Sequence, residues 1–213
     1  MSDWNIVGKP VLILLHMQHA ICDPKGAVAR VGHAKAVHES GILARQKALL
    51  EAFRERKLPV IYVNAITDVS KLTTAPVLGR FWSTVTGGIN MPGSRDVEVI
   101  SEVAPLPGEP VIGNFPFSMF ANNQLHEMLQ SLGVRTLVIA GVATDMAVLA
   151  SCWNAADLYY NLVVPSDACT GANYPSQEAA MKMISAIAMV TPTEDVIAHL
   201  VKTGSETGLS SIR

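Results

Sequence analysis

The chain has 213 residues, of which 49% are hydrophobic and 16% are charged, and its formal net charge is -2. This composition supplies enough apolar side chains for a substantial core, and no run of Lys or Arg provides the basic surface that nucleic acid or anionic lipid requires. No apolar run is long enough for a membrane span or a signal peptide, so we expect a cytoplasmic protein that binds a small molecule.

Short runs rich in Val and Ile recur along the chain and predict the strands of a buried, mostly parallel sheet. They lie at residues 11–15, 60–63, 111–112, 137–142, 162–164 and 189–191. Helices are predicted between them at residues 42–53, 125–132, 143–158 and 176–188, the last with Ser176 as its N-cap. This order predicts a single α/β domain over residues 1–213, a Rossmann-like three-layer α/β/α sandwich around a six-stranded sheet.

In such a fold, ligands bind beyond the carboxyl ends of the strands, here near residues 16, 64, 114 and 143. The segment at residues 67–110 is rich in Gly, Pro, Ser and Thr, and we expect it to cover a pocket at that edge. The polar end at residues 202–213 is expected to be a tail or an arm on a partner subunit.

The three cysteines, Cys22, Cys152 and Cys169, are far apart and form no CxxC pair. This spacing indicates neither a disulfide framework nor a zinc site, and we expect three reduced thiols. Isolated glycines without a strand-to-helix GxGxxG pattern give no support for a dinucleotide, so no cofactor is expected.

Three segments together resemble the isochorismatase-like hydrolase superfamily, which includes cysteine hydrolases and nicotinamidases. The first, LILLHMQ at residues 12–18, is similar to the strand that ends in Asp-x-Gln in that family. The second, VIGNFPFSMF at residues 111–120, is similar to a strand followed by Lys and a Ser-x-Phe helix start. The third, IAGVATDMAV at residues 139–148, is similar to the Gly-Val-x-Thr-x-x-Cys-Val turn that carries the nucleophile.

The resemblance places the catalytic triad at three positions where this chain has other residues: His16 for the Asp, Asn114 for the Lys and Ala147 for the Cys. It also implies a cis peptide between Val142 and Ala143, an oxyanion hole formed by the backbone amides of Ala143 and Ala147, and a homo-oligomer, either a dimer or a tetramer. Isochorismatase-type members also lack the Cys and use the Asp as a proton donor to a vinyl ether.

Ala147 has no nucleophilic atom, so the covalent route through a thiolate is closed. Cys152 lies more than one helical turn further on, and Cys22, six residues after His16, is the better reserve candidate. The imidazole of His16 has an ordinary pKa near 6.5, so it could donate or accept a proton near neutrality, while Asn114 could orient its ring or a ligand.

Other candidates are weaker. Gln18, Phe81, Trp82, Phe117 and Phe120 are candidates for the pocket lining, although core or interface packing is an equal alternative. His19 lies near His16, but no matching Asp-x-His follows the second strand, so no metal is expected. His33 and His38 lie in a polar stretch and are interpreted as surface residues.

Two hypotheses follow. The first is a divergent hydrolase without a covalent intermediate that acts on a vinyl ether, ester or amide of a small molecule, with His16 as acid or base. The second is a catalytically inactive family member that binds a small ligand or serves in assembly.

Overall fold

A computed structural model describes residues 4–67, 77, 79 and 92–203. Its centre is a parallel sheet of seven strands in the order β3-β2-β1-β4-β5-β7, with β6 paired to β4 beside that path. The strands are β1 (Lys9–Leu15), β2 (Val60–Ala65), β3 (Val111–Asn114), β4 (Val134–Val142), β5 (Asn161–Pro165), β6 (Cys169–Thr170) and β7 (Met189–Thr191). All six predicted strands form, and β6 is a two-residue addition.

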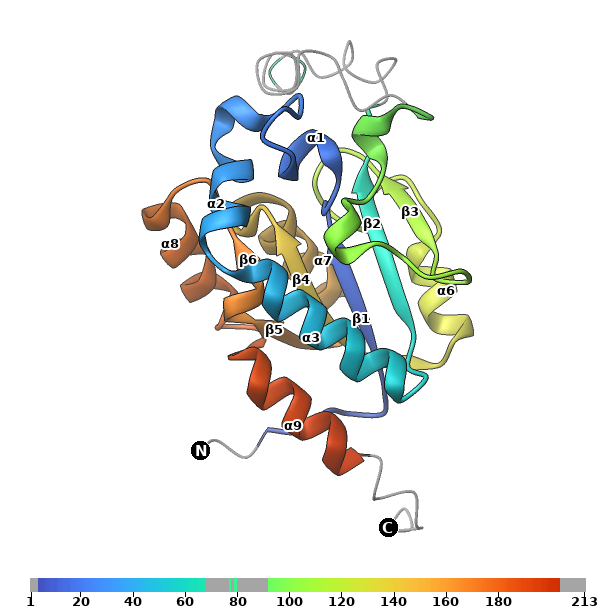
Figure 1. The fold of residues 1–213 in the computed structure, drawn as a ribbon. Coiled ribbons are helices and arrows are strands. Elements are labelled where there is room, and N and C mark those ends of the chain that lie inside the picture. Colours follow the sequence, from blue (N-terminus) through green and yellow to red (C-terminus); the bar gives the residue numbers. More distant parts are fainter. Residues whose placement is uncertain (1–3, 68–76, 78, 80–91, 204–213) are drawn as a thin grey trace, which may run out of the picture.

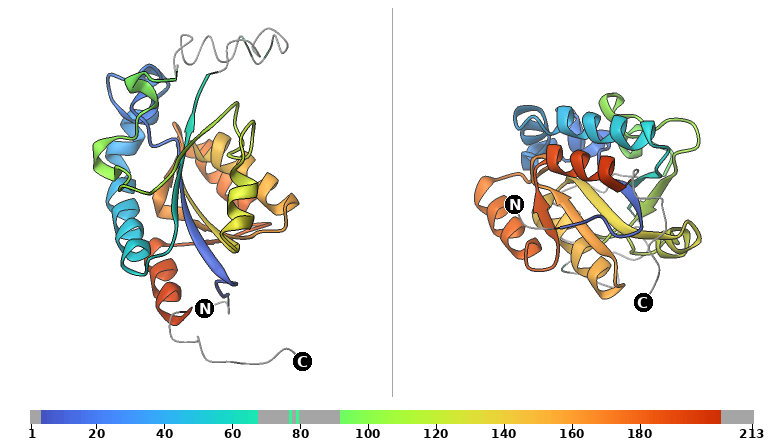
Figure 2. Two further views of the ribbon diagram at one scale, coloured as in Figure 1. Left: turned by 90° about the vertical axis from the view of Figure 1, so that its right-hand side faces the viewer. Right: turned by 90° about the horizontal axis from the view of Figure 1, so that it is seen from below.

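Helices cover both faces of this sheet, which confirms the three-layer prediction. Figure 2 shows α3 and α9 on one face and α6, α7 and α8 on the other, while α1 and α2 lie near the carboxyl ends of the strands (Figure 1). The helices are α1 (His19–Cys22), α2 (His33–Glu39), α3 (Ile42–Glu55), α6 (Leu125–Ser131), α7 (Leu149–Asp157), α8 (Tyr174–Ile184) and α9 (Thr193–Thr203). Short 3₁₀ turns lie at Ala29–Val31, Arg95–Val97, Ser101–Val103 and Ser166–Ala168.

The central strands are apolar because both of their faces are covered. From Val11 to Leu15, every residue of β1 is fully buried, and all six residues of β2 are buried. Burial of a Leu, Ile or Val side chain contributes about 1.5–3 kcal/mol before conformational entropy is counted. Continuous apolar runs, rather than alternating ones, are therefore the correct pattern for this sheet.

Two helix predictions differ from the structure in their boundaries. Helix α8 begins at Tyr174, and its N-cap is Asn173, whose side-chain oxygen accepts a hydrogen bond from the backbone N–H of Ser176 at 3.0 Å. Ser176 is therefore not the cap, since its N–H is the group that the cap satisfies. The predicted helix at 143–158 is divided into a π-helical turn, Thr144–Val148, and α7.

The end of the chain carries a helix that the sequence pattern did not suggest. Helix α9 continues to Thr203, so part of the expected tail is helical, while residues 204–213 lie outside the described part of the chain. The ring of His199 on α9 stacks on Trp4, with ring centroids 4.0 Å apart. This contact fixes the N-terminal segment against α9. Among the described residues, no helix is long and apolar enough to cross a membrane.

Candidate active site

The parallel strands bring the residues at their carboxyl ends to one edge of the sheet. Leu15 at the end of β1 lies opposite Gly141 in β4, and Asn114 at the end of β3 lies opposite Ala65 in β2. A Cβ atom added to Gly141 would lie 2.2 Å from the carbonyl oxygen of Leu15. Only glycine therefore allows the ends of β1 and β4 to approach this closely, directly before His16 and the turn at Ala143.

His16 and Asn114 meet at this edge, and both are almost completely buried. Nε2 of His16 lies 2.9 Å from Oδ1 of Asn114. The amide nitrogen of Asn114 donates to the carbonyl oxygens of Phe117 and Ser118, at 3.1 and 2.9 Å. These two bonds use both amide protons and orient Oδ1 toward the imidazole.

This orientation determines the tautomer of His16. Oδ1 of Asn114 can only accept, so Nε2 of His16 carries the proton and donates it. In the neutral ring, Nδ1 then has the free lone pair. His16 is thus arranged to accept a proton at Nδ1.

Burial lowers the pKa of His16 to about 4, against an ordinary value of 6.5, and the nearby His33 lowers it further. The hydrogen bond to Asn114 acts in the opposite direction. The expectation that this imidazole titrates near neutrality is therefore not met, since desolvation outweighs its one hydrogen bond. At neutral pH the ring is uncharged.

The turn after β4 carries Ala143 and Ala147, whose backbone amides the family resemblance implied as an oxyanion hole. The peptide between Val142 and Ala143 is cis, at the position that the family resemblance implied. Among the described residues, the backbone N–H of Ala143 donates to no backbone carbonyl. Ala143 and Ala147 are both buried, and Ala147 lies in the π-helical turn with only a methyl group at the nucleophile position.

None of the three cysteines replaces the absent nucleophile. Cys22, Cys152 and Cys169 are free thiols, and all are buried. Burial raises the pKa of each thiol, that of Cys169 to about 12. The Cys22 thiol donates to the carbonyl oxygen of His16 at 3.6 Å, so its role is to hold the backbone after β1.

Gln18 has a framework role. Its amide nitrogen donates to the carbonyl oxygens of Ala65 and Asp96, both at 3.1 Å, and its oxygen accepts the N–H of Ala65 at 2.7 Å. The side chain is fully buried. It joins the ends of β1 and β2 and has no free polar group to offer a ligand.

The predicted aromatic lining is only partly visible. Phe120 stacks on Tyr160, with ring centroids 6.2 Å apart, and also contacts His126 edge-on, so it packs between α6 and the end of α7. Phe117 is half-buried and contributes its carbonyl oxygen to Asn114. Phe81 and Trp82 lie outside the described residues.

The surface interpretation of His33 is wrong, whereas His38 is exposed as expected. His33 is 5% exposed, and neither of its ring nitrogens has a hydrogen-bond partner among the described residues. It begins α2, and the preceding Gly32 packs close to Ala172 after β6. The packing of α2 against the segment after β6 therefore buries the side chain of His33, although its neighbours in the sequence suggested a surface position.

Sequence reasoning also missed three polar residues on the turn after β4 and on α8, of which Asp145 is close enough to influence the pKa of His33. The buried atoms Thr144 Oγ1, Asp145 Oδ1 and Gln177 Oε1 have no hydrogen-bond partner among the described residues. Two of these residues lie inside the segment at 139–148. Their position next to Ala143 was the available signal. Within the described part of the chain, no group of three His, Cys, Asp or Glu side chains could hold a metal ion.

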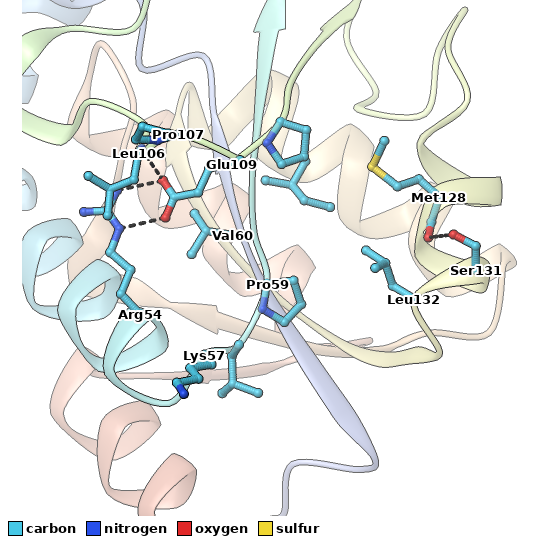
Figure 3. A pocket seen from close by; sticks show the side chains of 14 residues that line it. Arg54, Lys57, Pro59, Val60, Leu106, Pro107, Glu109, Met128, Ser131 and Leu132 are labelled. Atoms are coloured by element: carbon cyan, nitrogen blue, oxygen red, sulfur yellow. Dashed lines mark hydrogen bonds and ion pairs between the residues drawn. The ribbon is translucent and has the colours of Figure 1, made fainter.

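A separate cavity of about 620 Å³ lies at the opposite edge of the sheet, where β2 and β3 begin (Figure 3). Arg54 at the end of α3 and Glu109 before β3 form a two-pronged ion pair on its wall, with Nε and Nη2 each 2.8 Å from a carboxylate oxygen. Its lining residues lie at the amino ends of β2 and β3, whereas His16 and Asn114 lie at the carboxyl ends of β1 and β3. The cavity therefore does not belong to the site at the carboxyl ends.

Comparison with known proteins gives consistent matches. A model of the isochorismatase domain matches residues 10–195. The chain is 27% identical over 203 residues to the ureidoacrylate amidohydrolase RutB of Caulobacter segnis, covering 86% of this chain and 82% of the relative.

Solved structures with the same fold include a cysteine hydrolase from Pseudomonas syringae pv. phaseolicola, with a TM-score of 0.78, 22% identity and coverage of 95% and 99% of the two chains. The N-carbamoylsarcosine amidase of Thermoplasma acidophilum is 25% identical, with a TM-score of 0.68 and coverage of 87% and 97%.

Proposed function

The chain belongs to the isochorismatase family, and we propose that it hydrolyses a small molecule by direct attack of water, with His16 as the base. The observation that carries this proposal is the bond from His16 Nε2 to Asn114 Oδ1 at 2.9 Å. It leaves Nδ1 as the proton acceptor in a buried site. The turn at Ala143 lies at the same edge of the sheet, and among the described residues the N–H of Ala143 donates to no backbone carbonyl.

The lowered pKa of His16 favours base chemistry over acid chemistry. With a pKa of about 4, only about one ring in a thousand is protonated at pH 7. Hydrolysis of a vinyl ether begins with donation of a proton to carbon, and a neutral imidazole is a poor donor for that step. Attack of water on a carbonyl begins with proton removal, which a neutral imidazole can perform.

The proposed reaction is the hydrolysis of an amide-type carbonyl. Nδ1 of His16 takes a proton from water while the water oxygen bonds to the carbonyl carbon, and the N–H groups of Ala143 and Ala147 stabilise the resulting oxyanion. The C–N bond then breaks, and the proton held by His16 passes to the leaving nitrogen. The products are an acid and an amine, and His16 returns to its neutral form.

The names of the relatives support a carbon–nitrogen bond as the target. One relative is a ureidoacrylate amidohydrolase, and one structural neighbour is an N-carbamoylsarcosine amidase. We therefore place small ureido and amide compounds first, with esters as a second class, since the same geometry would stabilise their tetrahedral intermediates.

The test is product release from small ureido compounds, amides, esters and vinyl ethers by the purified protein. The His16→Ala variant should lose activity about 10²–10⁴-fold while remaining folded. The matched control is His38→Ala, which removes an exposed histidine and should leave turnover unchanged. Activity that survives His16→Ala would reject His16 as the base.

A second candidate is a family member that binds a ligand without turnover. It is favoured by the methyl group of Ala147 at the nucleophile position and by the raised pKa of every cysteine thiol. Absence of product across the panel, together with measurable binding of the same compounds, would select this candidate.

A further inference from the structure

Four polar residues lie on elements that pack together where β4 and β6 end, beside the turn at Ala143, and the charge of Asp145 reaches His33. Thr144 and Asp145 lie on the π-helical turn, Gln177 lies on α8, and His33 begins α2. Thr144 is fully buried, and His33 is 5% exposed. We call these four residues the Asp145 cluster.

The cluster contains more unpaired polar atoms than any other described place in the chain. Of the eight buried side-chain atoms without a hydrogen-bond partner among the described residues, five belong to it. They are His33 Nδ1, His33 Nε2, Thr144 Oγ1, Asp145 Oδ1 and Gln177 Oε1. An unpaired buried polar atom costs about 1–3 kcal/mol, so a bonding partner for these atoms would be strongly stabilising.

Two of these atoms face one point, which the absence of a side chain at Gly171 leaves open. A Cβ atom added to Gly171 would lie 3.2 Å from Asp145 Oδ1 and 3.4 Å from Gln177 Oε1. The Gln177 amide cannot simply be reversed, because its nitrogen already donates to the carbonyl oxygen of Cys169 at 3.2 Å. Two acceptor oxygens therefore converge without a donor between them.

The chemistry of the missing partner follows from this inventory. A carboxylate oxygen and an amide oxygen can only accept, and the Thr144 hydroxyl can accept as well. Burial lowers the pKa of His33, although the Asp145 charge opposes this, so the ring is neutral and offers one donor and one acceptor. A ligand group that carries several N–H bonds can donate to these acceptor atoms. A carboxylate cannot, because its oxygens would lie against the oxygens of Asp145 and Gln177.

We propose that the Asp145 cluster is a substrate subsite for a nitrogen group with two or more N–H bonds, such as a terminal carboxamide, ureido or ammonium group. The assignment rests on the proposed function, because Asp145 follows Ala143 by two residues and His33 is close enough to influence His16. A substrate whose carbonyl lies at the Ala143 N–H would place its nitrogen end at Gly171.

The test uses three probes of equal length that differ only in the head group: butylammonium, butyramide and butyrate. Binding to the wild-type protein is measured by titration calorimetry or ligand-observed NMR, without reference to turnover. We expect the two N–H donors to bind at least tenfold more tightly than butyrate. Equal or tighter binding of butyrate overturns the proposal, and so does the absence of binding by all three probes, which would leave the cluster to internal water.

Variants then locate the binding. Asp145→Asn and Gln177→Met should each weaken binding of butylammonium or butyramide about tenfold, while Asp157→Asn and Gln130→Met, which make the same changes at exposed positions, should not. Gly171→Ala removes no polar atom but fills the point between the two oxygens, so it should block the donors even if the other variants fold poorly. Unchanged binding in Asp145→Asn, Gln177→Met and Gly171→Ala rejects the subsite.

The His16→Ala variant separates this proposal from the proposed function. It should keep the preference for N–H donors, because His16 is not part of the Asp145 cluster. A donor preference in a protein without any turnover would reject the hydrolase assignment and retain the subsite. Turnover that depends on His16, without any preference for N–H donors, would retain the hydrolase assignment and reject the subsite.

Discussion

His16 and Asn114 come from strands that are not neighbours, and their side chains meet above the end of the strand between them. Nε2 of His16 and Oδ1 of Asn114 are 2.9 Å apart, although β2 separates β1 from β3 in the sheet. The amide of Asn114 is itself held by two backbone carbonyl groups. The tautomer of the candidate base is therefore set by the loop that follows β3.

The first prediction concerns the pKa of His16 in the Asn114→Asp variant. A carboxylate in place of the amide puts a negative charge beside the Nε2 proton, and an opposite charge favours the protonated ring. The pKa of His16 should rise from about 4 toward its ordinary value of 6.5. NMR titration of the histidine ring protons measures this directly.

The matched control for that titration is Asn154→Asp. The side-chain oxygen of Asn154 accepts from the Ser118 hydroxyl at 2.9 Å, so a carboxylate can replace it, and Asn154 makes no recorded contact with His16. Its variant should leave the His16 titration unchanged. A His16 pKa that stays near 4 in Asn114→Asp would show that desolvation alone determines it.

The second prediction concerns stability against pH. The pKa of His16 is about 4 in the folded protein and 6.5 in the unfolded chain, so between these values the unfolded chain binds more protons. The free energy of unfolding therefore falls as the pH is lowered from 6.5 to 4, by about 3 kcal/mol from this residue. This contribution is fully present above pH 6.5.

Urea unfolding of the wild type and of His16→Gln between pH 7 and pH 4 checks this value. The wild type should lose about 3 kcal/mol more than the variant over this range. The exposed His38 supplies the control, since His38→Gln should follow the wild type. Parallel curves for the wild type and His16→Gln would mean that His16 is not buried in neutral form.

The third prediction concerns thiol reactivity. Iodoacetamide should modify none of the three native cysteines in the folded protein, because all are buried and their pKa values are raised. Ala147→Cys places a thiol where the substrate carbonyl is proposed to bind. Ala147 is itself only 2% exposed, but a site that admits a small substrate should also admit iodoacetamide, so this thiol should be alkylated faster than the native ones. Mass spectrometry of the intact protein counts the modifications.

Ala155→Cys provides the comparison, because it introduces the same thiol at another buried position, on α7, that is not part of the proposed substrate site. It should remain unmodified until the protein unfolds. Equal labelling of the two variants would contradict the proposal that a substrate reaches Ala147.

The fourth prediction concerns the ion pair at the opposite edge of the sheet. Glu109 accepts from Arg54 through two bonds and from the backbone N–H of Leu106, each at 2.8 Å. Glu109→Gln removes the charge of a partly buried, hydrogen-bonded group and should cost about 1–3 kcal/mol of unfolding free energy. Activity should be unchanged, because the cavity wall is distant from His16.

Chemical denaturation of Glu109→Gln beside Glu39→Gln isolates the effect of burial. Glu39 pairs with Lys35 at 4.0 Å, and the two side chains are 67% and 77% exposed. An exposed pair of this kind contributes less than about 1 kcal/mol. Equal losses in the two variants would mean that the Arg54 pair is no stronger than a surface contact.

The strands and the long helix α3 could be predicted because local apolar patterns determine them. The position of His16 beyond β1 and of Asn114 at the end of β3 followed from the same pattern, together with the family resemblance. The direction in which the pKa of His16 shifts could not be predicted, because desolvation depends on every group that packs around the ring. A sequence gives the ordinary value of 6.5 and not the burial that lowers it.

The Asp145 cluster could not be predicted for a related reason. His33, Asp145 and Gln177 lie far apart in the chain, and only the packing of α2 and α8 around Gly171 brings them together. Similarly, the sequence pattern predicted Ser176 as the cap of α8, and this prediction was wrong because the side chain of Asn173 accepts the backbone N–H of Ser176.

Strand β3 is an edge strand, held on one side by β2, and the carbonyl oxygen of its Gly113 accepts a hydrogen bond from the side chain of Asn123 at 2.9 Å. Edge strands open locally at a lower free energy than the centre of a sheet. Opening of β3 would carry Asn114 away from His16 and leave the imidazole free to exchange tautomers. Amide hydrogen exchange at residues 111–114 should therefore be faster than in β1 and β4, and should report loss of the site geometry below the temperature of global unfolding.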